Sequence, residues 1–445
     1  MSISRSSRSY DFLVVGAGMA GLTAAASAAR RGARVLVIEK APEIGGSTLM
    51  SGGMVWTVRD PESLISQSPK AQPDLVRGLV KGFPRLLEWC RGLGAKVDEG
   101  VTVLGEGYGH RVDLVAYLRG CSALVADAGG SVATRTQIHS LAVEAGRVVG
   151  VEALSEGREM SLSAPWTLLA AGGFQADHEL LAEYVHPNAP KMLLRSQRAS
   201  TGDTLRAALE AGAVTSPGMQ GFYGHLVSSP VDDWGPGLFT RISQYHSDRC
   251  ALINLEGNNF QPDFEGDHFN TQAAVRQPEA RALMVMDDAV FRQQGSPTAS
   301  PSQLDRYATA REHGANLAQA DTLRELGTLV AEWGFAGEGV PDAVADFNRH
   351  SHGQPSTVMS GETILPVLPL EKPPFYAMEV RPAITFTHGG VLIDLHSRAI
   401  GSGGRPVPGL LAAGADSGGT FDGGYAGGLA MAGVTGLVAA DTVVG

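Results

Sequence analysis

The sequence predicts an α/β protein in which one domain is interrupted by an insertion. Residues 10–40 read as strand, glycine-rich turn, helix and strand, and residues 409–440 form a second glycine-rich, apolar segment. From about 222 to 379 the periodicity weakens, and aromatic, His, Pro and Asn residues become frequent. A chain of 445 residues is too long for a single core. We therefore expect one domain made of 9–221 and 381–445, and an inserted α+β domain at 222–380.

The first glycine-rich turn has the pattern of a dinucleotide site. Phe12–Val15 is a short apolar run, typical of a buried parallel strand. In the GxGxxG that follows, Gly16 allows a tight turn and Gly18 lets the backbone approach a pyrophosphate. Gly21 lets the next helix, beginning near Met19, pack on the strand. The amides at the start of this helix would point at the phosphates.

The second strand, Arg34–Ile38, ends at an acidic residue. Glu39 follows Gly21 by 18 residues, where an acid accepts hydrogen bonds from ribose hydroxyls and repels a 2′-phosphate. NADP is therefore not expected at this site. The glycine-rich loop Pro42–Met54 is expected to lie along the cofactor.

The remaining elements follow from hydrophobic periodicity and turn residues. We expect helices at Leu75–Leu93, Val112–Ala128 and Thr204–Ala211, strands at Val132–Leu141, Val148–Ala153 and Thr167–Ala171, and a strand–turn–strand at Pro382–Asp394.

Composition narrows the range of partners and compartments. The net charge of −11 argues against nucleic acid and anionic membrane surfaces. The first ten residues lack the apolar core of a signal peptide, and the longest apolar stretch, Tyr425–Ala440, is too short to span a membrane. Three scattered cysteines suit a reducing compartment. We expect a cytoplasmic protein without a membrane span.

No metal site is expected from the sequence. The 12 histidines show no diagnostic ligand spacing. Asp263, Glu265, Asp267 and His268 form a dense polar cluster, which we interpret as a loop or the rim of a pocket.

A series of motifs carries a resemblance to a known family. In order these are GAGMAGL at 16–22, Glu39-Lys40, GGSTLMSGG at 45–53, LAAGGF at 169–174, TGD at 201–203, HGGVLID at 388–394 and LAAGADSGG with GGYAGGLAMAGV at 411–434. The pattern resembles the fumarate reductase/succinate dehydrogenase flavoprotein family. The resemblance implies a Rossmann-like FAD-binding domain of the GR2 type, with an inserted capping domain that supplies substrate-binding residues.

The resemblance also implies which residues bind FAD. The residues that match the family motifs are Gly16, Ala17, Gly18, Ala20 and Gly21 at the pyrophosphate; Glu39 and Lys40 at the adenosine ribose; Gly46, Ser47, Thr48, Gly52 and Gly53 on the flavin side; Ile138 at the adenine; and Ala171, Gly172, Asp203, His388, Gly414, Asp416, Leu429 and Ala430 elsewhere around the cofactor. Ser47 stands where members with covalently attached FAD carry a His, which implies non-covalent FAD.

The substrate residues depart from those of fumarate reductases. Tyr425 replaces the Arg of their RLGGN-like segment, Asp267 stands where they have an acid-supplying Arg, and Phe386 replaces a substrate His. An Arg that binds a carboxylate through two hydrogen bonds has no conservative replacement, so fumarate reduction is not expected. A Tyr at position 425 is similar to the 3-ketosteroid Δ1-dehydrogenase branch, in which it donates to the substrate ketone.

Desaturation of a ketone needs a donor to the carbonyl, a base for the α proton and a hydride acceptor. Tyr425 is the predicted donor, since a phenol stays protonated at neutral pH. The predicted bases are Tyr245 and His246 first, then His225, and Tyr108 beside His110. Each of these four is alternatively a structural residue.

We therefore predict an FAD-dependent oxidoreductase acting on CH–CH donors. It would introduce a double bond α,β to a carbonyl in a small oxocyclohexane- or ketosteroid-like ring, and pass electrons to an external acceptor such as oxygen or a quinone. The alternatives are an enoate reductase or a tricarballylate-type carboxylate dehydrogenase using Arg249 or Arg276, and a flavoprotein carrier or sensor without turnover.

Overall fold

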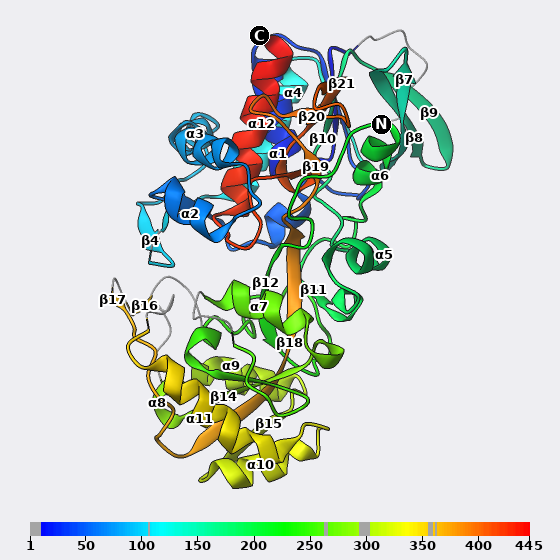
Figure 1. Ribbon diagram of the computed structural model, residues 1–445. Coiled ribbons are helices and arrows are strands. Elements are labelled where there is room, and N and C mark those ends of the chain that lie inside the picture. Colours follow the sequence, from blue (N-terminus) through cyan, green and yellow to red (C-terminus); the bar gives the residue numbers. More distant parts are fainter. Residues whose placement is uncertain (1–9, 106, 262–265, 293–302, 355–358, 361–362) are drawn as a thin grey trace. The chain divides into compact units, whose positions relative to one another are not determined.

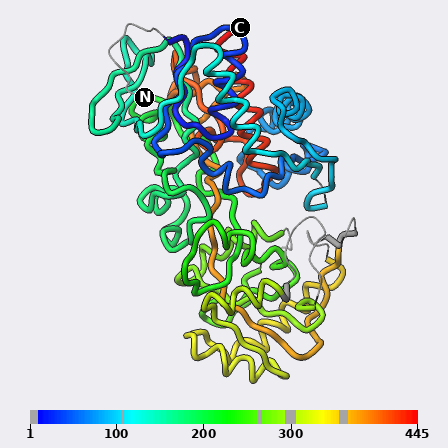
Figure 2. Tube along the Cα trace, turned by 180° about the vertical axis from the view of Figure 1, so that it is seen from behind, coloured from blue at the N-terminus to red at the C-terminus, as the bar shows by residue number. Residues whose placement is uncertain are grey.

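The computed structural model describes residues 10–105, 107–261, 266–292, 303–354, 359–360 and 363–445. The chain forms two compact units. The first unit holds residues up to 180, 196–222 and 386–445, and the second unit holds 181–195 and 223–385. Both ends of the colour scale, blue and red, meet in the first unit (Figures 1 and 2). The segment 181–195 falls in the second unit, whereas the sequence assigned it to the nucleotide domain.

The first unit is built on a six-stranded sheet in the order β20-β21-β10-β1-β2-β6. The strands are β1 (Phe12–Val15), β2 (Val35–Ile38), β6 (Ser131–Ala133), β10 (Trp166–Leu169), β20 (Arg398–Ile400) and β21 (Pro406–Ala412). All pairs are parallel except β20 with β21. Aliphatic residues fill β1 and β2 because helices and strands cover both faces of such a sheet.

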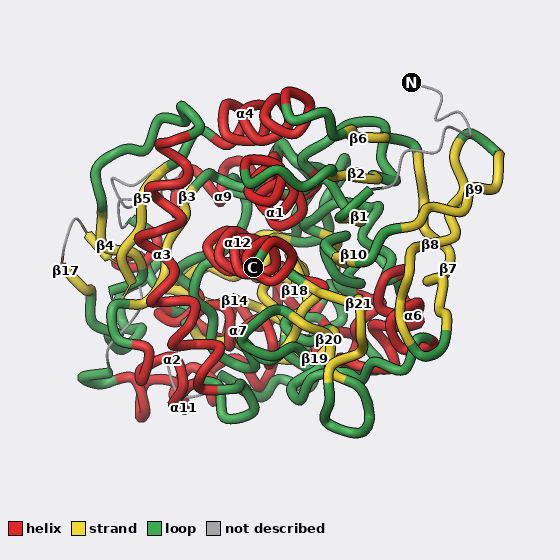
Figure 3. The backbone as a smooth tube through the Cα atoms, turned by 90° about the horizontal axis from the view of Figure 1, so that it is seen from above, coloured by secondary structure: helices red, strands yellow, loops and turns green. Residues whose placement is uncertain are grey.

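Four helices accompany this sheet: α1 (Met19–Arg30), α3 (Pro73–Gly92), α4 (Leu114–Asp127) and α12 (Gly428–Val444). Viewed from above, α12 lies beside α1, with α4 beyond α1 (Figure 3). Small residues make this approach possible. A Cβ added to Gly436 of α12 would lie 2.5 Å from the carbonyl oxygen of Ala20 in α1.

Smaller elements complete the first unit. They are an antiparallel sheet of β3 (Met54–Val58), β4 (Val101–Val103) and β5 (Gly107–Arg111), a second of β7 (Thr136–Glu144), β8 (Arg147–Ser155) and β9 (Arg158–Ser163), the helices α2 (Pro61–Gln67) and α6 (Asp203–Glu210), and a short parallel pair of β19 (Val391–Leu392) with β22 (Ser417–Gly418).

The second unit is a mixed sheet with helices. The long strand β18 (Phe375–Thr387) pairs with β11 (Leu193–Leu194), β12 (Phe222–Ser228), β14 (Ala282–Met286) and β15 (Leu317–Ala320), and β13 (Ala251–Asn254) pairs with β14. The helices are α7 (Asp267–Val275), α8 (Asp288–Phe291), α9 (Gln303–Glu312), α10 (Leu323–Ala331) and α11 (Val340–Ser351). Its apolar core is separate from that of the first unit.

The α/β fold class and the expected helices and strands are confirmed. One predicted strand is split: instead of a single strand at 132–141, β6 ends at Ala133 and β7 begins at Thr136. Arg135 between them has a φ of 56°, which ends the extended run and lets the chain leave the parallel sheet for the β7–β9 sheet. The loop 42–54 contains a 3₁₀ turn at Gly46–Met50. Among the described helices, none has the length and hydrophobicity of a membrane span.

Candidate active site

The predicted cofactor residues gather where the parallel strands of the first unit end. Gly16 follows β1 with a φ of 107°, and a Cβ there would lie 2.2 Å from the carbonyl oxygen of Ala170. A Cβ on Gly18 would have no protein atom closer than Thr48 Oγ1, at 3.8 Å, and no side chain caps α1 at Gly18. Packing therefore does not require a glycine at Gly18, whereas a pyrophosphate lying against the start of α1 does.

Glu39 is held at the end of β2 by two backbone amides. Its carboxylate accepts hydrogen bonds from Ala17 N and Ala41 N, each at 2.8 Å. A carboxylate has about four acceptor sites, so acceptor capacity remains for ribose hydroxyls. Lys40 donates to Asp203 Oδ2 at 2.9 Å and Thr201 Oγ1 at 2.6 Å. Asp203 is thus fixed at the first turn of α6.

A pocket of about 500 Å³ adjoins the predicted adenosine end. It is lined by Lys40, Pro42, Arg135, Gln137, Leu154, Glu156 and Gly157. Ile138, the predicted adenine contact, is buried in β7 next to Gln137.

The 3₁₀ turn Gly46–Met50 positions the predicted flavin-side residues. Thr48 Oγ1 accepts from Met19 N at 3.0 Å, and Ser47 Oγ lies 2.8 Å from Ser196 Oγ. A Cβ on Gly46 or Gly52 would meet nothing within 4 Å. These two glycines therefore border open space that a cofactor can enter.

Asp416 is a buried carboxylate that joins two loops. Its oxygens accept from Ala171 N at 2.6 Å and Gly173 N at 2.9 Å. Burial raises the pKa of Asp416 to about 6, against the lowering effect of those two amides. The neighbouring Gly172 and Gly414 both have positive φ, 100° and 63°. In the structure the carboxylate holds the turn after β10, and contact with the ribityl chain stays a prediction.

Tyr425 lies in an aromatic cluster just before α12. Its ring meets Trp56 edge-on at 5.4 Å and lies parallel to His388 at 6.4 Å. His388 Nδ1 in turn contacts the carbonyl oxygen of Asp422 at 2.8 Å. Gly428 N, at the start of α12, donates to the Tyr425 hydroxyl at 3.1 Å. Leu429 and Ala430 form the same first helical turn, so the phenol sits at the positive end of a helix dipole.

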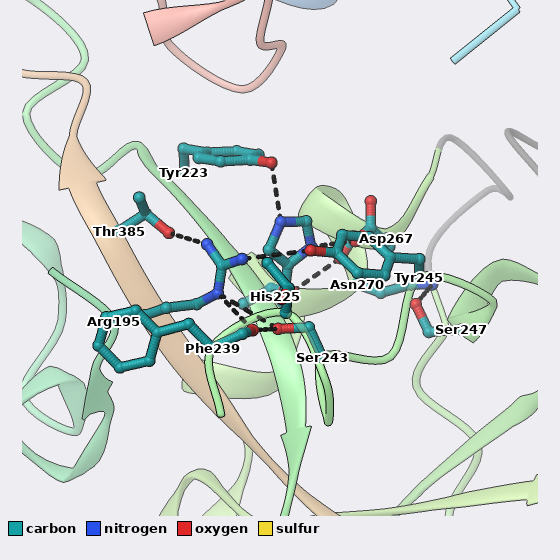
Figure 4. Close-up of polar contacts among 12 residues, drawn as sticks. Arg195, Tyr223, His225, Phe239, Ser243, Tyr245, Ser247, Asp267, Asn270 and Thr385 are labelled. Atoms are coloured by element: carbon teal, nitrogen blue, oxygen red, sulfur yellow. Dashed lines mark hydrogen bonds and ion pairs between the residues drawn. The ribbon is translucent and has the colours of Figure 1, made fainter. Parts of the chain in front are cut away.

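The second unit contains a hydrogen-bonded chain of three polar side chains. Tyr223 and His225 lie on β12, and Asp267 begins α7. The Tyr223 hydroxyl is 2.7 Å from His225 Nε2, and His225 Nδ1 bonds to Asp267 Oδ2 on the other side of the ring (Figure 4). His225 is 2% exposed and Asp267 3% exposed.

The protonation of this chain follows from its donors and acceptors. Burial lowers the pKa of His225, opposed by Asp267. Burial alone would raise the pKa of Asp267, but His225, with His268 and Arg195, brings that pKa below its usual value. We assign an ionised Asp267 that accepts the Nδ1 proton of a neutral His225. His225 Nε2 is then the acceptor for the Tyr223 O–H.

Tyr245 packs against the same histidine. Its ring lies edge-on to His225 at 4.4 Å, and the guanidinium carbon of Arg306 is 4.6 Å from its ring centre. Arg195 Nη2 donates to the Tyr245 hydroxyl at 3.2 Å. Burial lowers the pKa of Arg306 to about 10. Tyr245 thus borders the Tyr223–His225–Asp267 chain without a hydrogen bond to it.

The other predicted bases lie apart from this chain. His246 is buried, and burial, together with the nearby Arg306 and Arg249, lowers its pKa to about 3. Tyr108 lies in the first unit with its ring under Arg59, and a Cβ on Gly100 would lie 1.8 Å from its hydroxyl. His246 is therefore neutral at pH 7, and Tyr108 is closely packed.

The sequence analysis did not assign Tyr223 and Asp267 to the base. A signal for Tyr223 was present, because residues i and i+2 of a strand share a face, which places Tyr223 beside His225. Asp267 lies 42 residues from His225, and no local pattern connects them. Asp263 and Glu265 lie outside the described residues. Within the described part of the chain, no group of three or more His, Cys, Asp or Glu could hold a metal ion.

Comparison with known proteins adds three findings. Residues 11–429 match the family described as FAD binding domain. A fumarate reductase (cytochrome) of Shewanella frigidimarina is 29% identical over 457 residues, covering 95% of this chain and 74% of that protein. A 4-oxocyclohexanecarboxylate 2-dehydrogenase of Sinomonas cyclohexanicum is 26% identical over 549 residues, covering 98% and 93%. The solved 3-ketosteroid delta1-dehydrogenase from Sterolibacterium denitrificans shares the fold, with a TM-score of 0.76 and 20% identity over 98% of this chain and 99% of that one.

Proposed function

The chain belongs to the FAD binding domain family that its residues 11–429 match, and we propose that it is an FAD-dependent ketone dehydrogenase. The family resemblance, FAD as cofactor and an oxidoreductase related to fumarate reductases and ketosteroid dehydrogenases are confirmed. The proposal is the reaction: introduction of a double bond α,β to the carbonyl of a small cyclic ketone.

The observation that carries the proposal is the Tyr223–His225–Asp267 chain. Removal of an α proton needs a base that is neutral at rest and able to pass charge away. As the Tyr223 oxygen takes the α proton, its own proton moves to His225 Nε2, and Asp267 stabilises the resulting imidazolium through Nδ1. The electron pair of the broken C–H bond becomes the new C=C bond as hydride leaves the β carbon.

Tyr425 supplies the complementary donor in the first unit. Its hydroxyl would donate to the substrate carbonyl, where negative charge grows as the α proton leaves. The hydrogen bond that Tyr425 receives from Gly428 N, and its place at the start of α12, make it a stronger donor. FAD, when bound by the residues around Gly18, Glu39 and Thr48, supplies the two-electron acceptor for the hydride.

The test is anaerobic mixing of the purified flavoprotein with cyclic ketones while the absorbance of oxidised flavin is followed. We expect bleaching by a ketone, slowed about 100-fold or more in Tyr223→Phe, which lacks the relay hydroxyl, and in Tyr425→Phe, which lacks the carbonyl donor. Tyr108→Phe is the matched control and should bleach at close to the wild-type rate. Reoxidation by oxygen or a quinone would then identify the external acceptor.

The same experiment distinguishes the alternatives. Bleaching only by saturated carboxylates, or reoxidation of the reduced protein by an enoate without any response to ketones, would replace the proposal by an acid dehydrogenase or enoate reductase. A flavin colour that no ketone, acid or enoate alters would indicate a carrier or sensor.

A further inference from the structure

Arg249 is a buried cation that the second unit itself does not fully pair. It ends the 3₁₀ turn η4 (Ser247–Arg249) and is 6% exposed. Its Nε donates to the carbonyl oxygen of Pro366 at 3.1 Å, whereas its Nη1 has no hydrogen-bond partner. A buried charge without a counter-charge is costly. The guanidinium therefore calls for an anion that the described residues do not supply.

Other buried polar atoms without partners lie in the adjoining segments. They are His246 Nδ1, Gln261 Oε1, His268 Nε2 and Asn270 Oδ1. These segments are tied together, because Asn270 Nδ2 donates to Ser247 Oγ at 3.0 Å (Figure 4) and Gln261 Nε2 donates to the carbonyl oxygen of Asp248 at 3.1 Å. Native proteins leave few buried polar groups unpaired, so several in one place indicate a missing polar ligand.

Other arginines of the second unit are engaged by the protein. Arg281 binds the Glu379 carboxylate at 2.7 and 3.0 Å. Arg195 donates to Phe239 O, Ser243 Oγ, Thr385 Oγ1 and Tyr245 Oη. Arg276, also considered from the sequence, is exposed at the end of α7. Arg249 differs from these three in combining burial with an unpaired guanidinium nitrogen.

We propose that Arg249, with His246 and His268, binds a carboxylate of the substrate, so that the ketone acted on is a keto acid. The inference rests on the proposed function and narrows its substrate class. A carboxylate only accepts hydrogen bonds, which matches the guanidinium and an imidazole N–H on each histidine. The first turn of α7, which carries His268, adds a helix N-terminus that favours negative charge. A neutral hydroxyl could satisfy the amide oxygens but would leave the charge of Arg249 unpaired.

The test compares three probes with the holoenzyme: 4-oxocyclohexanecarboxylate, its methyl ester and cyclohexanecarboxylate. In Arg249→Gln we expect the KM for the keto acid to rise about 10- to 100-fold, as for loss of a charge-assisted hydrogen bond, with little change in kcat. The ester, which lacks the charge, should have the same KM in both proteins. Arg276→Gln is the control and should leave all three probes unaffected.

Binding of cyclohexanecarboxylate, followed by calorimetry, needs no turnover and separates the two proposals. If no ketone bleaches the flavin but this acid binds the wild type and not Arg249→Gln, the reaction is wrong and the carboxylate site stands. If ketones react and the acid and ester behave alike, the reaction stands and the site is overturned. Arg249→Gln should melt no lower than the wild type without ligand, because it removes an unpaired charge, and Arg249→Lys should recover part of the acid binding. A marked loss of unliganded stability in both variants would make Arg249 structural and overturn the site.

Discussion

Single side chains in the second unit are kept neutral or paired by burial. Burial lowers the pKa of His246 to about 3 and that of His268 to about 4. The buried Asp267 remains ionised because it contacts His225. The proton relay and the cationic Arg249 thus lie among imidazoles that carry no charge at neutral pH. A substrate anion entering there meets cationic and N–H donors only.

The low pKa of His246 makes a prediction about stability and pH. Unfolded histidine titrates near pH 6.5 and folded His246 near pH 3, so between these values the unfolded chain binds the extra proton. The contribution of His246 to the free energy of unfolding is therefore complete above about pH 6.5. It is lost on acidification by up to about 1.4 kcal/mol per pH unit. Asp416, with its raised pKa, acts in the opposite direction between its unfolded value and about pH 6.

Urea denaturation across this pH range checks the prediction. The slope of unfolding free energy against pH should be smaller in His246→Gln than in the wild type, while the Asp416 contribution is common to both proteins. The exposed His396 provides the control, and His396→Gln should keep the wild-type slope. An unchanged slope in His246→Gln would mean that His246 titrates normally in the folded protein.

At the scale of elements, the β1–α1 turn separates packing from ligand binding. Gly21 lies where a Cβ would be 2.0 Å from the carbonyl oxygen of Gly16, which brings α1 onto β1. Gly18 has no comparable neighbour and an ordinary φ of −84°. One glycine therefore serves the fold, and the other serves the predicted cofactor.

Two alanine substitutions test that separation. Gly18→Ala should leave the cofactor-free protein within about 1 kcal/mol of wild-type stability, since Gly and Ala differ little at such a helix start. The added methyl group should nevertheless weaken FAD binding by at least about tenfold, because it occupies the phosphate approach. Gly21→Ala should destabilise the protein whether or not FAD is present. Stability by denaturation and affinity by flavin fluorescence give both quantities. Equal loss of stability in the two variants would contradict the assignment.

At the scale of the molecule, the predicted cofactor contacts come from distant parts of one chain. Residues near 16–53, 171–203 and 414–430 meet at the carboxyl ends of β1, β2, β10 and β21. Crevices at this edge are where open α/β sheets bind ligands. FAD bound there holds both terminal parts of the sequence in the first unit.

Bound FAD should therefore raise the stability of the whole first unit by mass action. At a free FAD concentration 100 times its Kd, the free energy of unfolding should increase by about 2.7 kcal/mol. Riboflavin, which lacks the pyrophosphate and adenosine, should stabilise far less. Denaturation with each compound added to cofactor-free protein measures the difference. Equal stabilisation by both would show that the contacts at Gly18 and Glu39 add nothing.

The sequence by itself determined the parts of this protein that depend on neighbouring residues. The strand–glycine–helix pattern at 12–30, the acid at Glu39 and the apolar runs of the sheet are local, so period and spacing predict them. The same local motifs led to FAD, which is confirmed. The individual cofactor contacts, with Ser47 and non-covalent attachment among them, stay predictions.

Only the tertiary structure decided the chemistry of the second unit. Asp267 reaches His225 because α7 packs beside β12, and the burial of Arg249 arises from segments that meet only in the folded chain. Whether a Tyr, His or Arg is a base, a ligand or a packed side chain depends on burial and on distant partners. Local sequence carries no record of either, because both come from contacts between residues far apart in the chain.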